Sequence, residues 1–169
     1  MLRVSDELPD ADAWKRDRAG AAQRGEHPLM LAPMPSGYAV LGDTQFLPGY
    51  SVLLASQRVE GLNDLMLEQR RDFLLDMVLL GDAVMAVCQP ERIDYAIMSD
   101  ADHSLQAHVH ARYDWEPEEY RNGSAFSYPR ERWTDPAYQY SEERHGELRA
   151  MLSDMVLQLV AASEGHVAE

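Results

Sequence analysis

Hydrophobic and polar residues along this chain follow two different periods, and each period predicts one kind of element. Residues 64–87 place apolar side chains at helical spacing and end before Pro90, which predicts a long helix. A second stretch, from about Glu142 to Ala162, keeps its apolar residues on one helical face and predicts another long helix. Short runs rich in β-forming residues predict four strands, at Tyr38–Leu41, Ser51–Leu54, Ile93–Met98 and Leu105–Tyr113.

The segments between these elements have weaker patterns. Residues 7–24 predict a short polar helix anchored by Trp14, a proline-rich connector runs from His27 to Pro35, and residues 114–141 are aromatic and irregular. The strands cluster around one long helix, which favours an α+β fold with an antiparallel sheet over a doubly wound repeat. We expect one compact domain with three parts, at residues 1–36 (N-terminal helix and connector), 37–141 (core with aromatic extension) and 142–169 (C-terminal helix).

Composition excludes several classes of protein. Acidic residues number 29 against 15 basic residues, a formal charge of −14, so the chain lacks the positive field that attracts nucleic-acid polymers or anionic membranes. The single cysteine, Cys88, excludes an intramolecular disulfide and a multi-cysteine zinc site. Because the sequence shows neither a signal peptide nor a long apolar span, we expect a cytoplasmic protein without a membrane segment.

Three of the six histidines fall within eight residues, from His103 to His110. Alternate side chains of a strand share a face, so one face is apolar and suited to packing under the long helix, and the other is polar. The apolar face consists of Leu105, Ala107, Val109 and Ala111, and the polar face of Ser104, Gln106, His108, His110 and Arg112. The polar face is a solvent-exposed row of hydrogen-bonded side chains, a metal site of His108 and His110 with Asp100 or Asp102, or a ligand site.

Several segments, taken together, are specific to one known family. They are Leu41–Tyr50, Leu62–Leu65, Gly81–Ala83, Tyr95–Ile97, Ala107–His108 and Arg112–Glu118. Their sequence resembles the histidine triad (HIT) superfamily of nucleotide hydrolases and transferases, and more narrowly a bacterial branch often described as diadenosine-polyphosphate-hydrolase-like. The resemblance implies a half-barrel antiparallel sheet with a long central helix, a homodimer, no cofactor, and a small-molecule ligand such as a nucleotide.

The HIT motif alternates three histidines with apolar residues, and its middle histidine attacks the α-phosphate. Two registers fit this chain. In one, Gln106, His108 and His110 take the three places, and His108 is the nucleophile. In the other, Ser104, Gln106 and His108 take them, and the nucleophile position holds glutamine.

The flanking residues favour the second register. The family carries a basic residue four positions after the third histidine, and Arg112 has that spacing from His108. The family also carries a Gly-Asn pair upstream, with its Asn six positions before the nucleophile. In the second register this pair becomes Ser99-Asp100, and both flanks align without a gap.

This register predicts that the standard chemistry is lost. The nitrogen lone pair of a glutamine amide is delocalised, so Gln106 cannot form a nucleotidyl intermediate at a useful rate, and Asp100 adds a negative charge where the family binds phosphate. The sequence therefore predicts a binding, regulatory or repurposed protein. The alternatives are an active nucleotide hydrolase with His108 as nucleophile and a metal-dependent enzyme using His108 and His110. The candidate residues implied by the resemblance are His108, Gln106, His110 and Ser104 for catalysis, and Asp100, Ser99, Arg112, Asp43 and Gln45 for substrate binding.

Overall fold

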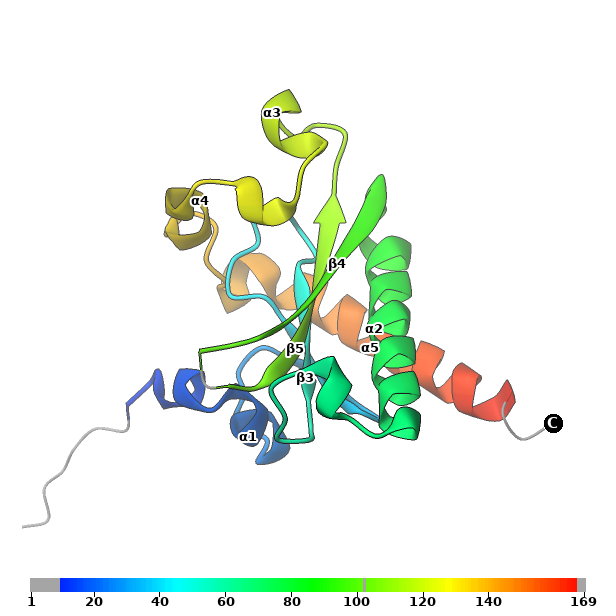
Figure 1. Ribbon diagram of the computed structural model, residues 1–169. Helices are drawn as coiled ribbons and strands as arrows, with labels where there is room; N and C mark the ends of the chain where they lie inside the picture. The colour runs from blue at the N-terminus through cyan, green and yellow to red at the C-terminus, as the bar shows by residue number, and fades with distance from the viewer. Residues whose placement is uncertain (1–9, 102, 167–169) are drawn as a thin grey trace, which may run out of the picture.

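The structure is a computed structural model that describes residues 10–101 and 103–166. Its five strands form one antiparallel sheet in the order β1-β2-β3-β5-β4. They are β1 (Met30–Met34), β2 (Gly37–Leu41), β3 (Ser51–Ala55), β4 (Arg92–Ser99) and β5 (Leu105–Arg112). Two long helices, α2 (Leu67–Cys88) and α5 (Glu142–His166), pack together against the same side of the sheet (Figure 1). The α+β prediction is confirmed.

The core lies between the sheet and these two helices. The apolar face of β5, including Ala107 and Val109, packs into one cluster with Phe73 and Leu80 of α2 and with Leu152 of α5. Small residues on β5 let the helix approach the sheet closely. This packing confirms the side of the strand that was expected to lie under the long helix.

A close contact fixes α2 against the edge of the sheet. The Tyr95 hydroxyl of β4 lies only 2.0 Å from the position that a Cβ atom on Gly81 would occupy. A larger side chain at Gly81 therefore requires Tyr95 to move, so the glycine in the middle of the helix has a packing role that offsets its low helix propensity.

The predicted connector from His27 to Pro35 was wrong in part, because it contains β1. The strand pairs with β2 only and forms one edge of the sheet. Proline lacks an N–H group, and edge strands tolerate it, so Pro33 fits inside β1. The proline content of this segment therefore masked a strand.

The N-terminal helix is shorter than predicted within the described residues. It consists of η1 (Ala13–Arg16) and α1 (Arg18–Gln23), and positions 7–9 of the prediction lie outside the described residues. Asp17 separates the two elements in a non-helical conformation, and its side chain caps α1 by accepting a hydrogen bond from the Gly20 amide.

The segment 114–141 is more regular than predicted, with short helices at α3 (Glu118–Arg121), η3 (Ala125–Ser127) and α4 (Arg130–Thr134). Another short turn, η2 (Leu62–Asp64), precedes α2, and α5 continues to His166 beyond the predicted end.

Arg112, with a side chain that is 0% exposed, organises the segment after β5. It donates to the Glu116 carboxylate and to the carbonyl oxygens of Tyr120 and Gly123.

No helix among residues 10–101 and 103–166 has the length and apolar character needed to span a membrane.

Candidate functional site

The side of the sheet opposite α2 carries a cavity of about 260 Å³. Its floor is made by neighbouring strands, because Val52 on β3 pairs with His108 on β5, and Leu54 pairs with Gln106. Val40 on β2 extends the floor. The remaining lining comes from α1, the loop between β2 and β3, the β4–β5 turn and α4, and includes Arg18, Asp43, Tyr50, Asp100 and Trp133.

Gln106 and Asp100 lie together at this cavity. The side-chain amide of Gln106 donates a hydrogen bond of 3.0 Å to one carboxylate oxygen of Asp100, and the Ala101 amide donates to the other at 2.7 Å. Gln106 is 4% exposed, whereas Asp100 is exposed at the turn between β4 and β5. The carboxylate thus fixes the orientation of the glutamine amide.

His108 and Tyr50 both line the cavity and contact each other through a hydrogen bond. The Tyr50 hydroxyl lies 2.7 Å from Nδ1 of His108. Burial raises the pKa of Tyr50 far above its usual range, so it remains a phenol. Burial also lowers the pKa of His108, although Asp100 opposes this effect, and the imidazole is neutral at pH 7.

The direction of the hydrogen bond between Tyr50 and His108 sets the tautomer of His108, because the hydroxyl and Nδ1 can each donate or accept. If the hydroxyl donates to Nδ1, the proton of the neutral imidazole is on Nε2, and Nε2 is then a hydrogen-bond donor. Among the described residues, the Tyr50 hydroxyl has no hydrogen-bond partner other than His108.

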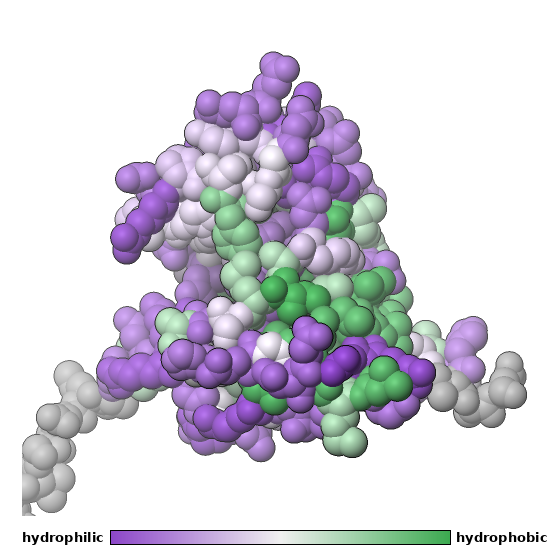
Figure 2. Space-filling view, viewed as in Figure 1, coloured by the Kyte–Doolittle hydropathy of each residue, from purple (hydrophilic) through white to green (hydrophobic). Residues whose placement is uncertain are grey.

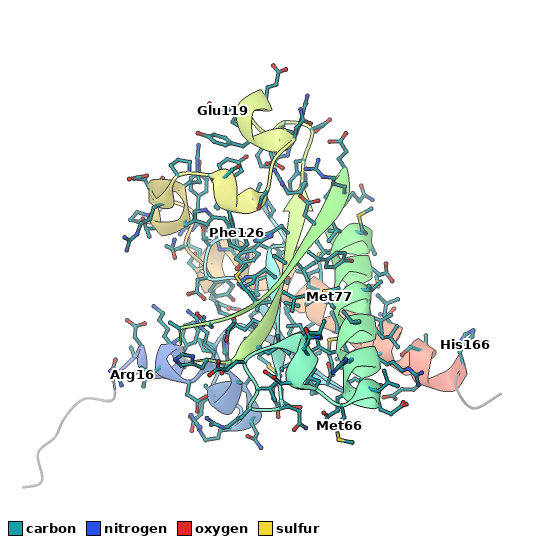
Figure 3. The ribbon with its side chains drawn as sticks, viewed as in Figure 1. Arg16, Met66, Met77, Glu119, Phe126 and His166 are labelled. Atoms are coloured by element: carbon teal, nitrogen blue, oxygen red, sulfur yellow. The ribbon has the colours of Figure 1, made fainter. Side chains whose placement is uncertain are left out.

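His110 lies behind the cavity wall. Its ring is 2% exposed and stacks on Tyr50, with ring centroids 4.7 Å apart, and its Nε2 atom is buried without a hydrogen-bond partner in the described part of the chain. Burial, followed by the neighbouring His108, lowers the pKa of His110 to about 3. Phe126 contacts His110 edge-on, on the side of the sheet opposite Met77 of α2 (Figure 3). His110 therefore packs as a neutral aromatic ring.

The expected common face of the two histidines is confirmed. The rings of His108 and His110 are stacked at an interplanar angle of 10°, with their centroids 6.0 Å apart. They differ in environment, because His108 lines the cavity and His110 does not.

Arg18 is a cavity residue that sequence reasoning missed. Its two terminal nitrogens donate to the two carboxylate oxygens of Asp43, at 2.8 and 2.7 Å, and its guanidinium stacks over the Trp14 ring at 4.8 Å. Arg18 belongs to α1, outside the segments that carry the family resemblance. Trp133, another lining residue, was interpreted only as part of an aromatic segment. Neither residue has a sequence signal that points to a cavity.

The remaining candidate residues lie outside the cavity lining. Gln45 is buried and bonds the loop between β2 and β3, since its side chain contacts the backbone of Gly42, Gly49 and Tyr50. Arg112 is committed to its buried ion pairs. Ser99 and Ser104 also lie off this cavity, and Ser104 lines a smaller pocket beside α1. The cavity therefore brings together four of the nine sequence candidates, namely Gln106, His108, Asp100 and Asp43.

The expected metal alternative has little geometric support. The described residues contain no group of three or more histidine, cysteine, aspartate or glutamate side chains arranged to hold a metal ion. Nδ1 of His108 is occupied by Tyr50 and Nε2 of His110 is buried. Asp102, one of the suggested ligands, lies outside the described residues.

Comparison with known proteins identifies the fold. No protein-family model and no curated protein matches the sequence. Among solved structures, a histidine triad protein from Marinobacter aquaeolei VT8 is 19% identical with a TM-score of 0.64, covering 77% of this chain and 89% of that chain. A histidine triad protein from Sinorhizobium meliloti 1021 is 15% identical with a TM-score of 0.63, covering 75% and 87%.

A third solved structure is a diadenosine triphosphate hydrolase from Plasmodium falciparum in complex with Cyclomarin A. It is 13% identical with a TM-score of 0.56, and the alignment covers 77% of each chain. This chain therefore has the histidine triad fold, as the resemblance implied.

Proposed function

We propose that this chain is a small-molecule-binding protein with the histidine triad fold, which does not form the nucleotidyl-histidine intermediate. The observation that carries the proposal is Gln106 on the cavity floor, hydrogen-bonded to Asp100. A glutamine amide is a poor nucleophile because its nitrogen lone pair is delocalised, and here its N–H group donates to a carboxylate. The side chain serves as a polar anchor for a ligand.

The tautomer of His108 argues against the alternative of an active hydrolase that uses this residue. An attacking imidazole needs a nitrogen lone pair directed at phosphorus. We assign the donor role in the contact between Tyr50 and His108 to the hydroxyl, which leaves the lone pair of His108 on Nδ1 and the proton on Nε2. His108 is thus suited to donate a hydrogen bond to a ligand in the cavity.

Charge also argues against the nucleotide chemistry of the fold. Asp100 and Asp43 line the cavity with two carboxylates, and Arg18 is paired to Asp43 through both terminal nitrogens. A phosphate entering this site meets Asp100, which makes no ion pair with a described residue, and like charges repel. The charges of the cavity lining therefore favour binding of a ligand without phosphate groups over turnover of a nucleotide.

The test is a turnover assay with diadenosine triphosphate, diadenosine tetraphosphate and adenosine phosphoramidate. We expect the purified protein to leave all three intact. His108→Ala serves as the comparison, because it removes the remaining candidate nucleophile. Turnover by the unmodified protein that disappears in His108→Ala would contradict the proposal and support an active hydrolase.

We further propose that two copies pair through β4 and α2. Strand β4 is an edge of the sheet, and hydrophobic surface extends over it and the adjacent side of α2 (Figure 2). Exposed apolar residues in this region include Leu74, Leu75, Val78, Met85 and Tyr95. An unpaired strand edge beside an exposed apolar helix face is a suitable surface for self-association.

A further inference from the structure

We propose that the cavity binds an organic cation with an apolar body, its ammonium group held by Asp100 and Gln106. The inference rests on the proposed function, because a site that turns over nucleoside phosphates requires the opposite charge preference. It concerns the chemical class of the ligand and uses the charges, acceptors and apolar floor of the cavity.

The charges of the lining residues favour a cation. Arg18 and Asp43 neutralise each other in their bidentate pair, and His108 is neutral at pH 7. Asp100 is then the acidic lining residue that makes no ion pair with a described residue, although it lies within the electrostatic reach of Arg18. A bound ammonium group neutralises this carboxylate, whereas a phosphate adds to its charge.

The hydrogen-bond acceptors around Asp100 fit an ammonium group. Among the described residues, each carboxylate oxygen of Asp100 accepts one hydrogen bond, from Gln106 and from the Ala101 amide, and a carboxylate has about four acceptor positions. The side-chain oxygen of Gln106 has no hydrogen-bond partner among the residues that the structure describes. An ammonium group donates three hydrogen bonds, and these two side chains supply acceptors for it.

The rest of the cavity fits an apolar body. Val40, Val52 and Leu54 form a continuous apolar floor across β2 and β3, next to His108 and Gln106 on β5. Trp133 adds an aromatic wall, and an aromatic face attracts cations as well as apolar groups. The volume of about 260 Å³ is below the usual range for drug-sized ligands, so the body is small.

Three probes with the same phenyl body and different head groups test the charge preference. They are 2-phenylethylammonium, 2-phenylethanol and 3-phenylpropanoate, titrated into the full-length chain by calorimetry. We expect the ammonium to bind at least about tenfold more tightly than the alcohol, equivalent to about 1.4 kcal/mol, and the carboxylate to bind most weakly.

Two variants locate the binding site. Asp100→Asn keeps the shape of the side chain and removes its charge, and we expect it to reduce ammonium binding about tenfold, to the level of the alcohol. Asp82→Asn is the matched control, because Asp82 is an exposed aspartate on α2, across the sheet from the cavity. We expect it to leave ammonium binding unchanged.

The outcomes separate this inference from the proposed function. Equal binding of the three probes, no binding of the ammonium, or unchanged binding in Asp100→Asn overturns the cation site. Turnover of diadenosine triphosphate in the same preparation, abolished by His108→Ala, overturns the proposed function instead. A protein without turnover and without ammonium preference would retain the proposed function and lose this inference.

Discussion

The Tyr50 hydroxyl lies 2.7 Å from Nδ1 of His108, so the tautomer of this imidazole is tied to the direction of one hydrogen bond. Two buried groups with shifted pKa values make this contact, the tyrosine as a phenol and the histidine as a neutral ring. With the hydroxyl as donor, as we propose, His108 is a hydrogen-bond donor through Nε2. Whether a nucleotide hydrolase can operate here depends on this proton.

The tautomer is directly measurable. Long-range ¹H–¹⁵N spectra of the histidine rings are expected to show His108 with its proton on Nε2 at pH 7. Tyr50→Phe removes the hydroxyl, so we expect a mixture of tautomers in that variant. A wild-type signal with the proton on Nδ1 would contradict the assignment. Tyr140→Phe provides the control, because it removes a half-buried hydroxyl that is bonded to Glu142 and Arg149 and not to a histidine.

Weak binding of a nucleotide follows from the charges of the cavity. We expect AMP to bind no better than about millimolar, a free energy near −4 kcal/mol. Asp100→Asn removes one carboxylate from the site and is expected to tighten AMP binding by about 1.4-fold to fivefold, because exposed charges interact by about 0.2–1 kcal/mol. Calorimetry measures both constants. Micromolar binding by the wild type, or no gain in Asp100→Asn, would show that Asp100 does not repel the phosphate.

The buried ion pair of Arg112 and Glu116 is expected to control stability. Both side chains are 0% exposed. Glu116→Gln leaves the guanidinium with less compensating charge, and removing one partner of a buried pair costs about 3–5 kcal/mol of unfolding free energy. Urea denaturation measures this loss. Glu118→Gln, at an exposed position in the same segment, should change stability by no more than about 0.5 kcal/mol.

The same pair predicts a pH dependence. Burial disfavours the charge of Glu116, but hydrogen bonds from Arg112, from the Tyr128 hydroxyl and from the Tyr113 amide hold the pKa of this carboxyl below its usual range. A lowered pKa means that its contribution to stability is complete above the unfolded-state pKa, near 4.3. The contribution is lost as the pH falls through the folded-state pKa. In Glu116→Gln, the free energy of unfolding should therefore depend less steeply on pH in the acidic range than in the wild type.

Self-association is tested by sedimentation at micromolar concentration. We expect a mass near twice the 19.1 kDa of one chain, and Val78→Asp on α2 is expected to shift it toward the monomer because a charge on a buried interface is costly. Leu157→Asp, an equally apolar and exposed change on α5, is the matched control. A wild-type mass near 19.1 kDa would contradict pairing.

Regular periods made much of the fold predictable. The alternation from Leu105 to Arg112 gave both faces of β5, and the apolar spacing of residues 64–87 gave the helix that covers one of them. β1 was missed because Pro33 argues against a strand in sequence, whereas an edge strand tolerates it. Local patterns cannot reveal which edge of a sheet a segment occupies.

The site was predictable only where its residues lie in the strand pattern. Gln106 and His108 share a face by alternation, and Asp100 follows from the family spacing. Strand alternation places Arg112 on the same face as His108. However, the buried ion pair with Glu116, four residues later in the sequence, holds the Arg112 side chain away from the cavity. Arg18 reaches Asp43 across 25 positions of sequence, and such long-range contacts leave no local signal.

The pairing of Arg18 with Asp43 makes the N-terminal helix part of the proposed binding site. The strands supply the floor of the cavity, while α1 supplies Arg18, whose positive charge neutralises the Asp43 carboxylate. Substitution of Arg18 in α1 would change the net charge of the cavity lining, and with it the charge of the ligands that fit, without altering the sheet. In the proposed binding protein, ligand preference therefore depends partly on a segment that the triad motif does not include.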